Sequence, residues 1–246
     1  MSRHIPNVIT LLNLFVGIWV SVSVINHDPT LAGWLLVLAL GLDFSDGMAA
    51  RLLHVVSPIG KELDSLADVI SFGLTPGILM ADLIASAQGM SFPAQALSLS
   101  PFAWAWAGGV ITVFSALRLA LFNLDERQQE VFFGVPTPGN TALMMSLWLI
   151  VQLHPGSAVA TLLQSLPFLL GLTALLCWLL VAEIRLVALK FKTFGWAENW
   201  YRYAMIGIGL SSMALFQYRA VPILFVGYLI ASAVERYFVR KKDPSV

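Results

Sequence analysis

The feature that most constrains this chain is a series of long apolar segments separated by short polar turns. A helix needs roughly 20 apolar residues to cross the hydrocarbon core of a bilayer, and 58% of this 246-residue chain is hydrophobic. We expect an all-α polytopic membrane protein that forms one membrane-embedded domain over residues 1–246. The predicted helical bundle has about eight transmembrane helices, near residues 8–26, 31–52, 62–84, 101–123, 138–153, 160–182, 200–217 and 220–238.

The charge composition excludes several classes of protein. Lys and Arg number 14, Asp and Glu also number 14, and no block of like charge occurs, so no surface suits nucleic acid. The single Cys177 lies in an apolar segment, which rules out an internal disulfide.

Basic residues predict the orientation of the bundle, because positively charged loops stay in the cytoplasm. With eight crossings and a cytoplasmic N-terminus, every Lys and Arg except Arg219 falls on the cytoplasmic side. We therefore expect a multi-pass protein of the cell (inner) membrane with both termini in the cytoplasm.

Four carboxylates interrupt the second and third apolar segments. At about 100° per residue, Asp43 and Asp46 share one helical face, and so do Asp64 and Asp68. Two such acidic faces would repel each other in an apolar setting unless cations neutralise them. Hard oxygen ligands without His or Cys nearby favour Mg²⁺ or Mn²⁺, and Mg²⁺ commonly works on phosphate substrates. The pattern predicts a metal-dependent site for phosphoryl chemistry.

Small residues and one cation accompany these carboxylates. Gly47 and Ala50 lie on the same face as Asp43 and remove side-chain bulk there, so a ligand can approach the backbone. Close helix packing is the alternative explanation for both residues. Arg51 suits phosphate binding, although an interfacial anchor would also occupy this position.

The complete pattern resembles the signature of the CDP-alcohol phosphatidyltransferases. All its fixed positions match the form D-x-x-D-G-x-x-A-R-(x)8-G-x-x-x-D-x-x-x-D, which runs here from Asp43 to Asp68. The resemblance implies two divalent ions held by the four Asp residues, with Asp68 also the catalytic base. It further implies that the CDP-lipid is bound by Gly47, Ala50, Arg51, Gly60, Asn7 and Thr10, although helix capping is an alternative role for Asn7 and Thr10.

Flanking segments look like the bacterial phosphatidylserine synthase branch of this family, at residues 5–14, 60–68, 71–76, 118–123 and 133–138. The resemblance covers about residues 1–145, and further transmembrane helices follow over about 146–240. It suggests that Arg118, Asn123 and Lys61 contact the acceptor. Alternatively, Arg118 anchors its helix at the cytoplasmic side, Asn123 caps a helix, and Lys61 marks the cytoplasmic boundary of the membrane. One departure is Leu121, where the branch has a second Arg.

The reaction implied by this resemblance joins CDP-diacylglycerol and L-serine to give phosphatidylserine and CMP, within a homodimer surrounded by membrane lipids. Another acceptor, such as glycerol 3-phosphate or inositol phosphate, is the nearest alternative. It would need more cationic contacts than Arg51, Lys61 and Arg118 supply. A cation-coupled transporter is the alternative from another class, but its site would lie near the midplane with inverted repeats, which we do not find.

Overall fold

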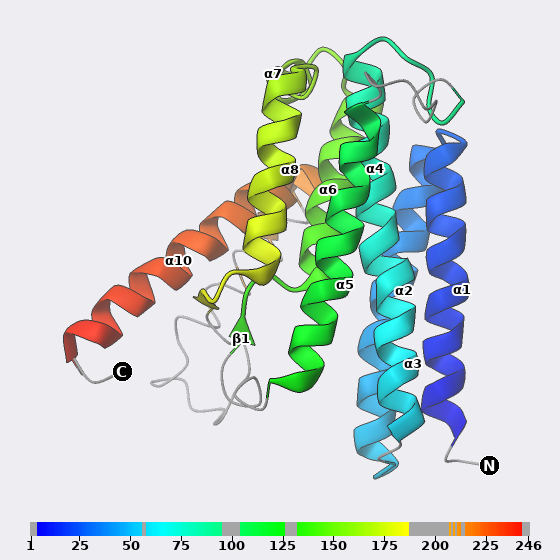
Figure 1. Cartoon of the computed structure of the whole chain (residues 1–246), viewed down its shortest axis with the longest axis vertical. Coiled ribbons are helices and arrows are strands. Elements are labelled where there is room, and N and C mark those ends of the chain that lie inside the picture. The colour runs from blue at the N-terminus through cyan, green and yellow to red at the C-terminus, as the bar shows by residue number, and fades with distance from the viewer. Residues whose placement is uncertain are drawn as a thin grey trace.

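The computed structural model describes residues 4–55, 58–94, 104–125, 132–186, 207, 209, 211–212 and 215–242. Within these ranges the regular secondary structure is helical, apart from one short antiparallel pairing of β1 (Phe132–Phe133) with β2 (Arg185–Leu186). The sequence did not predict this pairing. Figure 1 shows the long helices standing side by side, while α10 leans away from them.

The first two helices form a tight antiparallel hairpin. Helix α1 (Ile5–Ile25) has Pro6 in its first turn, where the missing N–H of proline needs no partner. Helix α2 (Pro29–Leu52) begins after Asp28, whose carboxylate accepts a hydrogen bond from Leu31 N at 2.9 Å. The hairpin therefore brings the start of α1 close to the end of α2.

The third apolar segment is one continuous helix from residue 58 to residue 87, and it is the centre of the bundle. It comprises α3 (Pro58–Asp68), a π-helix η2 (Val69–Leu74) and α4 (Thr75–Ala87). Its most apolar 18-residue stretch is 72% buried, whereas the corresponding stretches of the other membrane-length helices described are 22–39% buried. The π-helix begins directly after Asp68, and such wide turns are frequent at functional sites.

The remaining helices surround this central one. The short 3-10 helix η3 (Trp104–Ala107) leads into α5 (Gly108–Leu124), and α6 (Thr137–Leu153), α7 (Ala158–Leu162) and α8 (Leu166–Val181) follow. After a second 3-10 helix, η5 (Gln217–Arg219), α10 (Ala220–Lys242) ends the described chain.

Helices α4 and α5 approach closely at two glycines. A Cβ on Gly108 would overlap Gly77 O and lie 2.6 Å from Ala81 N, both of them backbone atoms that cannot swing aside. We expect Gly108→Ala to lower the free energy of unfolding by about 1–3 kcal/mol, measured as a lower thermal midpoint in detergent.

Gly109→Ala is the matched control, because a Cβ there meets nothing within 4 Å among the described residues. Alanine in place of this helical glycine should stabilise the protein by roughly 0.5–1 kcal/mol. Equal melting temperatures for the two variants would contradict the close contact.

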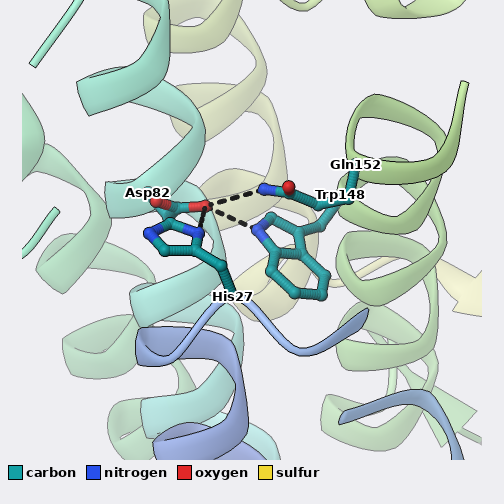
Figure 2. A network of polar contacts seen from close by, with 4 residues as sticks. All are labelled: His27, Asp82, Trp148 and Gln152. Carbon is teal, nitrogen blue, oxygen red and sulfur yellow. Dashed lines mark hydrogen bonds and ion pairs between the residues drawn. The ribbon is translucent and has the colours of Figure 1, made fainter. Parts of the chain in front are cut away.

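A buried polar network joins three segments at the end of the bundle away from α3 (Figure 2). Asp82 on α4 accepts hydrogen bonds from Trp148 Nε1 at 2.6 Å and Gln152 Nε2 at 3.4 Å, both on α6. His27, in the turn between α1 and α2, places its Nδ1 3.8 Å from the same oxygen. Asp82 is 1% exposed, so these contacts fix the positions of the helices relative to one another there.

One expectation about the helices needs correction, and another stays a prediction. Four helical stretches of the described chain are long and apolar enough to cross a membrane, at Ile5–Ile25, Pro29–Leu52, Pro58–Ala87 and Trp104–Leu124, and the total of about eight transmembrane helices stays a prediction. The helix predicted near 160–182 is two helices, because Leu163–Ser165 separate them and Pro167 starts α8. Most of the helix predicted near 200–217 lies outside the described residues.

Candidate functional site

Three of the predicted carboxylates meet between α2 and the central helix. Asp43, Asp64 and Asp68 each offer a carboxylate oxygen, and the three oxygens lie within 4.8 Å of one another. We call these residues the acidic triad. Asp68 Oδ1 is buried and has no hydrogen-bond partner among the residues described. Three converging carboxyl oxygens fit the preference of a hard divalent cation for oxygen ligands.

The fourth carboxylate, Asp46, is held differently. Its Oδ2 accepts a hydrogen bond from Thr10 Oγ1 at 2.7 Å, and the side chain is buried. Asp46 lies one turn after Asp43, beside the triad but outside the group of converging oxygens. A role for Asp46 as a metal ligand stays a prediction, whereas its attachment to α1 is a structural finding.

A cleft of about 590 Å³ opens beside the acidic triad, between the start of α1, the end of α2 and the start of α3. Its lining includes every residue that the sequence assigned to the CDP-lipid, together with two of the carboxylates and Lys61, which was expected to contact the acceptor: Asn7, Thr10, Asp46, Gly47, Ala50, Arg51, Gly60, Lys61 and Asp64. Segments separated by more than fifty residues therefore contribute to one concave surface.

Gly47 is explained by this cleft. A Cβ at Gly47 would meet nothing within 4 Å among the described residues, so no neighbouring helix requires glycine there. The alternative explanation, close helix packing, does not hold for this residue. A side chain at Gly47 would instead occupy the cleft.

The lining of the cleft carries both signs of charge. It includes two carboxylates, Asp46 and Asp64, and two basic side chains, Arg51 and Lys61. The Arg51 guanidinium is kept near its own helix by a hydrogen bond from Nε to Gly47 O at 3.1 Å. A phosphate-containing ligand bridged to carboxylates by cations suits this distribution of charge.

Comparison with known proteins agrees with this geometry. Residues 3–183 match the model of the CDP-alcohol phosphatidyltransferase family, and this range contains the acidic triad and the whole cleft. The chain belongs to this family. The match also reaches beyond residue 145, where the resemblance read from the sequence ended.

Individual relatives carry a common name, CDP-diacylglycerol–serine O-phosphatidyltransferase. The protein from Bacillus subtilis is 33% identical over 136 residues, which are 55% of this chain and 70% of that protein. The protein from Helicobacter pylori strain J99 is 28% identical over 239 residues, covering 96% of this chain and 92% of the relative. The Saccharomyces cerevisiae protein is 32% identical over 162 residues, covering 59% and 54% respectively.

The three residues expected to contact the acceptor of this phosphatidyltransferase are divided between two environments. Lys61 Nζ donates to Asn123 O at 3.0 Å, and Asn123 Nδ2 donates to Ser65 Oγ at 2.7 Å. These bonds join α3 to the end of α5. Asn123 does not cap α5, because Asp125 occupies the capping position.

Arg118, in contrast, points into the bundle. It is 7% exposed, its Nε has no hydrogen-bond partner in the described part of the chain, and its guanidinium lies 5.9 Å from the centre of the Phe122 ring. The Arg118 guanidinium interacts electrostatically with the carboxylate of Asp68. Leu121, which replaces the second Arg of the family branch, is 47% exposed and lies on the outer side of α5.

Three further residues line the cleft without having been predicted: Pro6, His54 and Val55. His54 follows the end of α2 and has a φ of 51°, a left-handed conformation that often ends helices. A His outside the fixed motif gave no signal in the sequence, since its place in the cleft depends on how α2 meets α3.

Proposed function

We propose that this chain is a phosphatidylserine synthase, which transfers the phosphatidyl group of CDP-diacylglycerol to the hydroxyl of L-serine and releases CMP. The observation that carries this proposal is the acidic triad beside a cleft that is also lined by Arg51 and Lys61. Relatives named for the same reaction support the choice of serine, and one of them aligns with 96% of this chain.

The carboxylates fit a divalent metal site. Asp43, Asp64 and Asp68 would hold Mg²⁺ or Mn²⁺, with Asp46 beside them as a further ligand for a second ion. When bound, the cations neutralise charge on the pyrophosphate and on the departing CMP. Thr10 orients Asp46 for this role through its 2.7 Å hydrogen bond.

Asp68 is the proposed base. It takes the proton of the serine hydroxyl as that oxygen attacks the phosphorus attached to diacylglycerol. A bond forms between the serine oxygen and this phosphorus, and the bond from the same phosphorus to the bridging oxygen breaks. The bridging oxygen leaves with CMP, and the proton stays on Asp68 until the products depart.

The cleft residues hold the nucleotide end of the donor. Arg51 pairs with a phosphate, and Gly47, Ala50 and Gly60 leave room for the cytidine and pyrophosphate to approach the backbone. Asn7 and Thr10 contribute polar contacts from α1. Lys61 adds a second positive charge to the lining of the cleft, and its hydrogen bond to Asn123 O holds it in place.

The cleft lies at the end of the bundle where α1 begins and α3 starts. We place this end at the cytoplasmic face of the cell membrane, with both termini on that side and a single domain over residues 1–246. The start of α1 and the end of α10 both lie toward the lower part of Figure 1, which supports a common side. A homodimer completes the proposed assembly, and CMP and serine exchange with the cytosol.

An acceptor panel tests the function. We expect purified protein in detergent with CDP-diacylglycerol and Mg²⁺ or Mn²⁺ to release CMP when L-serine is added. Glycerol 3-phosphate and inositol phosphate should support less than about a tenth of this rate, because one buried guanidinium is a poor match for a phosphate group with up to two charges. EDTA should abolish the reaction.

Metal-dependent CMP release in detergent also separates the enzyme from a cation-coupled transporter. The control is the same mixture without acceptor. A phosphorylated polyol that outperforms serine would assign the chain to another reaction of the same family, and CMP release that survives EDTA would remove the role proposed for the acidic triad.

A further inference from the structure

Unpaired polar groups gather around the π-helix at the level of Asp68. Native proteins pair nearly all of their buried polar atoms, so a group of unpaired ones at one level needs an explanation. Among the residues the structure describes, these buried atoms have no hydrogen-bond partner: Asn13 Oδ1 and Nδ2, Asp68 Oδ1, Ser115 Oγ, Arg118 Nε, Thr137 Oγ1, and Asn140 Oδ1 and Nδ2. We call these six residues the polar ring.

Helix α5 contributes Ser115 and Arg118. The Thr112 hydroxyl donates to Gly73 O at 3.0 Å, and a Cβ on Gly73 would lie 3.2 Å from the Cβ of Ser115. These contacts fix α5 against the π-helix. Arg118 follows Ser115 by about one turn and interacts electrostatically with Asp68.

Helix α6 contributes Thr137 and Asn140. Two contacts fix its register against the central helix: Thr141 Oγ1 donates to Phe72 O at 2.9 Å, and further along Trp148 binds Asp82. The two helices therefore run in the same direction. Thr137 lies one turn before Thr141, as Asp68 lies one turn before Phe72, so the start of α6 is level with Asp68.

Helix α1 contributes Asn13. Ser71, in the π-helix, donates from Oγ to Asn13 O at 3.1 Å, and a Cβ on Gly17 would lie 2.7 Å from Ser71 Cα. Helix α1 is thus pressed against the π-helix at this height. The Asn13 side chain is 0% exposed, as is that of Asn140.

We propose that the polar ring is the binding site for the acceptor amino acid, with Asn140, Thr137 and Asn13 as residues that determine its specificity. This inference rests on the proposed function. Arg118 was already expected to contact the acceptor, and Asn13 and Thr137 lie in segments that resemble the phosphatidylserine synthase branch, whereas Asn140 had no signal in the sequence. Arg118 binds the carboxylate of serine. The amides of Asn13 and Asn140 offer both donors and acceptors to its carboxylate and ammonium groups, and Asp68 receives the hydroxyl proton.

The charge of the polar ring fits a zwitterion. It holds one guanidinium beside one carboxylate, and its other members are neutral hydroxyls and amides. A phosphomonoester with a charge near −2 would meet a single cation in this buried setting. A small amino acid is neutral overall, so its carboxylate can pair with Arg118 while its ammonium group donates to the amide oxygens of Asn13 and Asn140.

Asn140→Leu is the test, because leucine is similar in size and cannot hydrogen-bond. We expect the KM for L-serine to rise at least tenfold, while the KM for CDP-diacylglycerol changes less than twofold. The melting temperature of the substrate-free protein should stay the same or rise, since no hydrogen bond within the protein is lost. A structural asparagine would show the opposite change in melting temperature.

Ser146→Ala is the matched control on the same helix. Ser146 is also buried, but its hydroxyl donates to Tyr218 O at 2.6 Å. This variant should melt at a lower temperature and keep its KM for serine. Thr137→Val provides a second variant of the polar ring if Asn140→Leu fails to fold, and we expect the same rise in KM for serine.

Arg118→Gln adds a specificity readout. Ethanolamine lacks the carboxylate of serine, so the wild type should prefer serine to ethanolamine. In Arg118→Gln this preference should be at least tenfold smaller. Wild-type enzyme that releases no CMP with L-serine would overturn the proposed function and the polar ring together. Wild-type enzyme that uses serine, with unchanged KM for serine in both Asn140→Leu and Thr137→Val, would overturn the polar ring alone.

Discussion

Asp68→Asn is expected to lower kcat for serine-dependent CMP release by about 10²–10⁴-fold, the usual contribution of a positioned general base. Asparagine keeps the shape of the side chain but cannot take the proton of the serine hydroxyl. The measurement is CMP release under saturating substrates across a wide range of Mg²⁺ and Mn²⁺ concentrations. Titrating metal matters because Asp68 also belongs to the acidic triad.

The metal titration separates the two roles of Asp68. Loss of activity that high metal concentration restores would make Asp68 a ligand and not the base. Loss that persists at saturating metal supports proton transfer. Asp28→Asn is the control, since Asp28 caps α2 at the far end of the hairpin and asparagine caps helices equally well. It should leave kcat unchanged.

Asp64→Asn should raise the metal concentration needed for half-maximal activity by at least about 10–100-fold, the size of effect seen when even the outer partners of metal ligands are lost. The same change removes one of three converging negative charges. We therefore expect the metal-free variant to melt at a higher temperature than metal-free wild type, because repulsion within the acidic triad falls.

Glu62→Gln is the matched control for Asp64→Asn. Glu62 lies on the same helix, is exposed, and is not a member of the acidic triad. Its neutralisation should change neither the metal requirement nor the melting temperature of the metal-free protein. An Asp64→Asn variant with wild-type metal dependence would show that Asp64 does not hold the ion.

Much of the helical fold could be predicted from apolar length alone. The helices expected near 31–52 and 138–153 are observed at Pro29–Leu52 and Thr137–Leu153. Hydropathy over the whole segment did not reveal the break between α7 and α8, because the polar residues Gln164 and Ser165 are outweighed by the apolar residues on both sides. Among the described residues, four helical stretches are long and apolar enough to span a membrane, and the full set of about eight stays a prediction.

The candidate site divides along similar lines. Fixed spacing placed Asp43 and Asp64 on facing stripes, and the structure brings these stripes together. The bond from Thr10 to Asp46 was beyond prediction, because it depends on how α1 docks. Asn140 gave no signal either, since one amide in an apolar segment has no pattern until the central helix is placed beside it.

The π-helix determines how the side chains at one end of the central helix are rotated about its axis relative to those at the other end. Below it lie Asp64 and Asp68, and above it Asp82 is locked to Trp148. Each residue of a helix advances the side-chain direction by about 100°. Insertion or deletion of a single residue between Asp68 and Asp82 would therefore turn the carboxylates away from Asp43, even with every motif residue intact. Spacing across this segment is thus as much a part of the site as its acidic side chains.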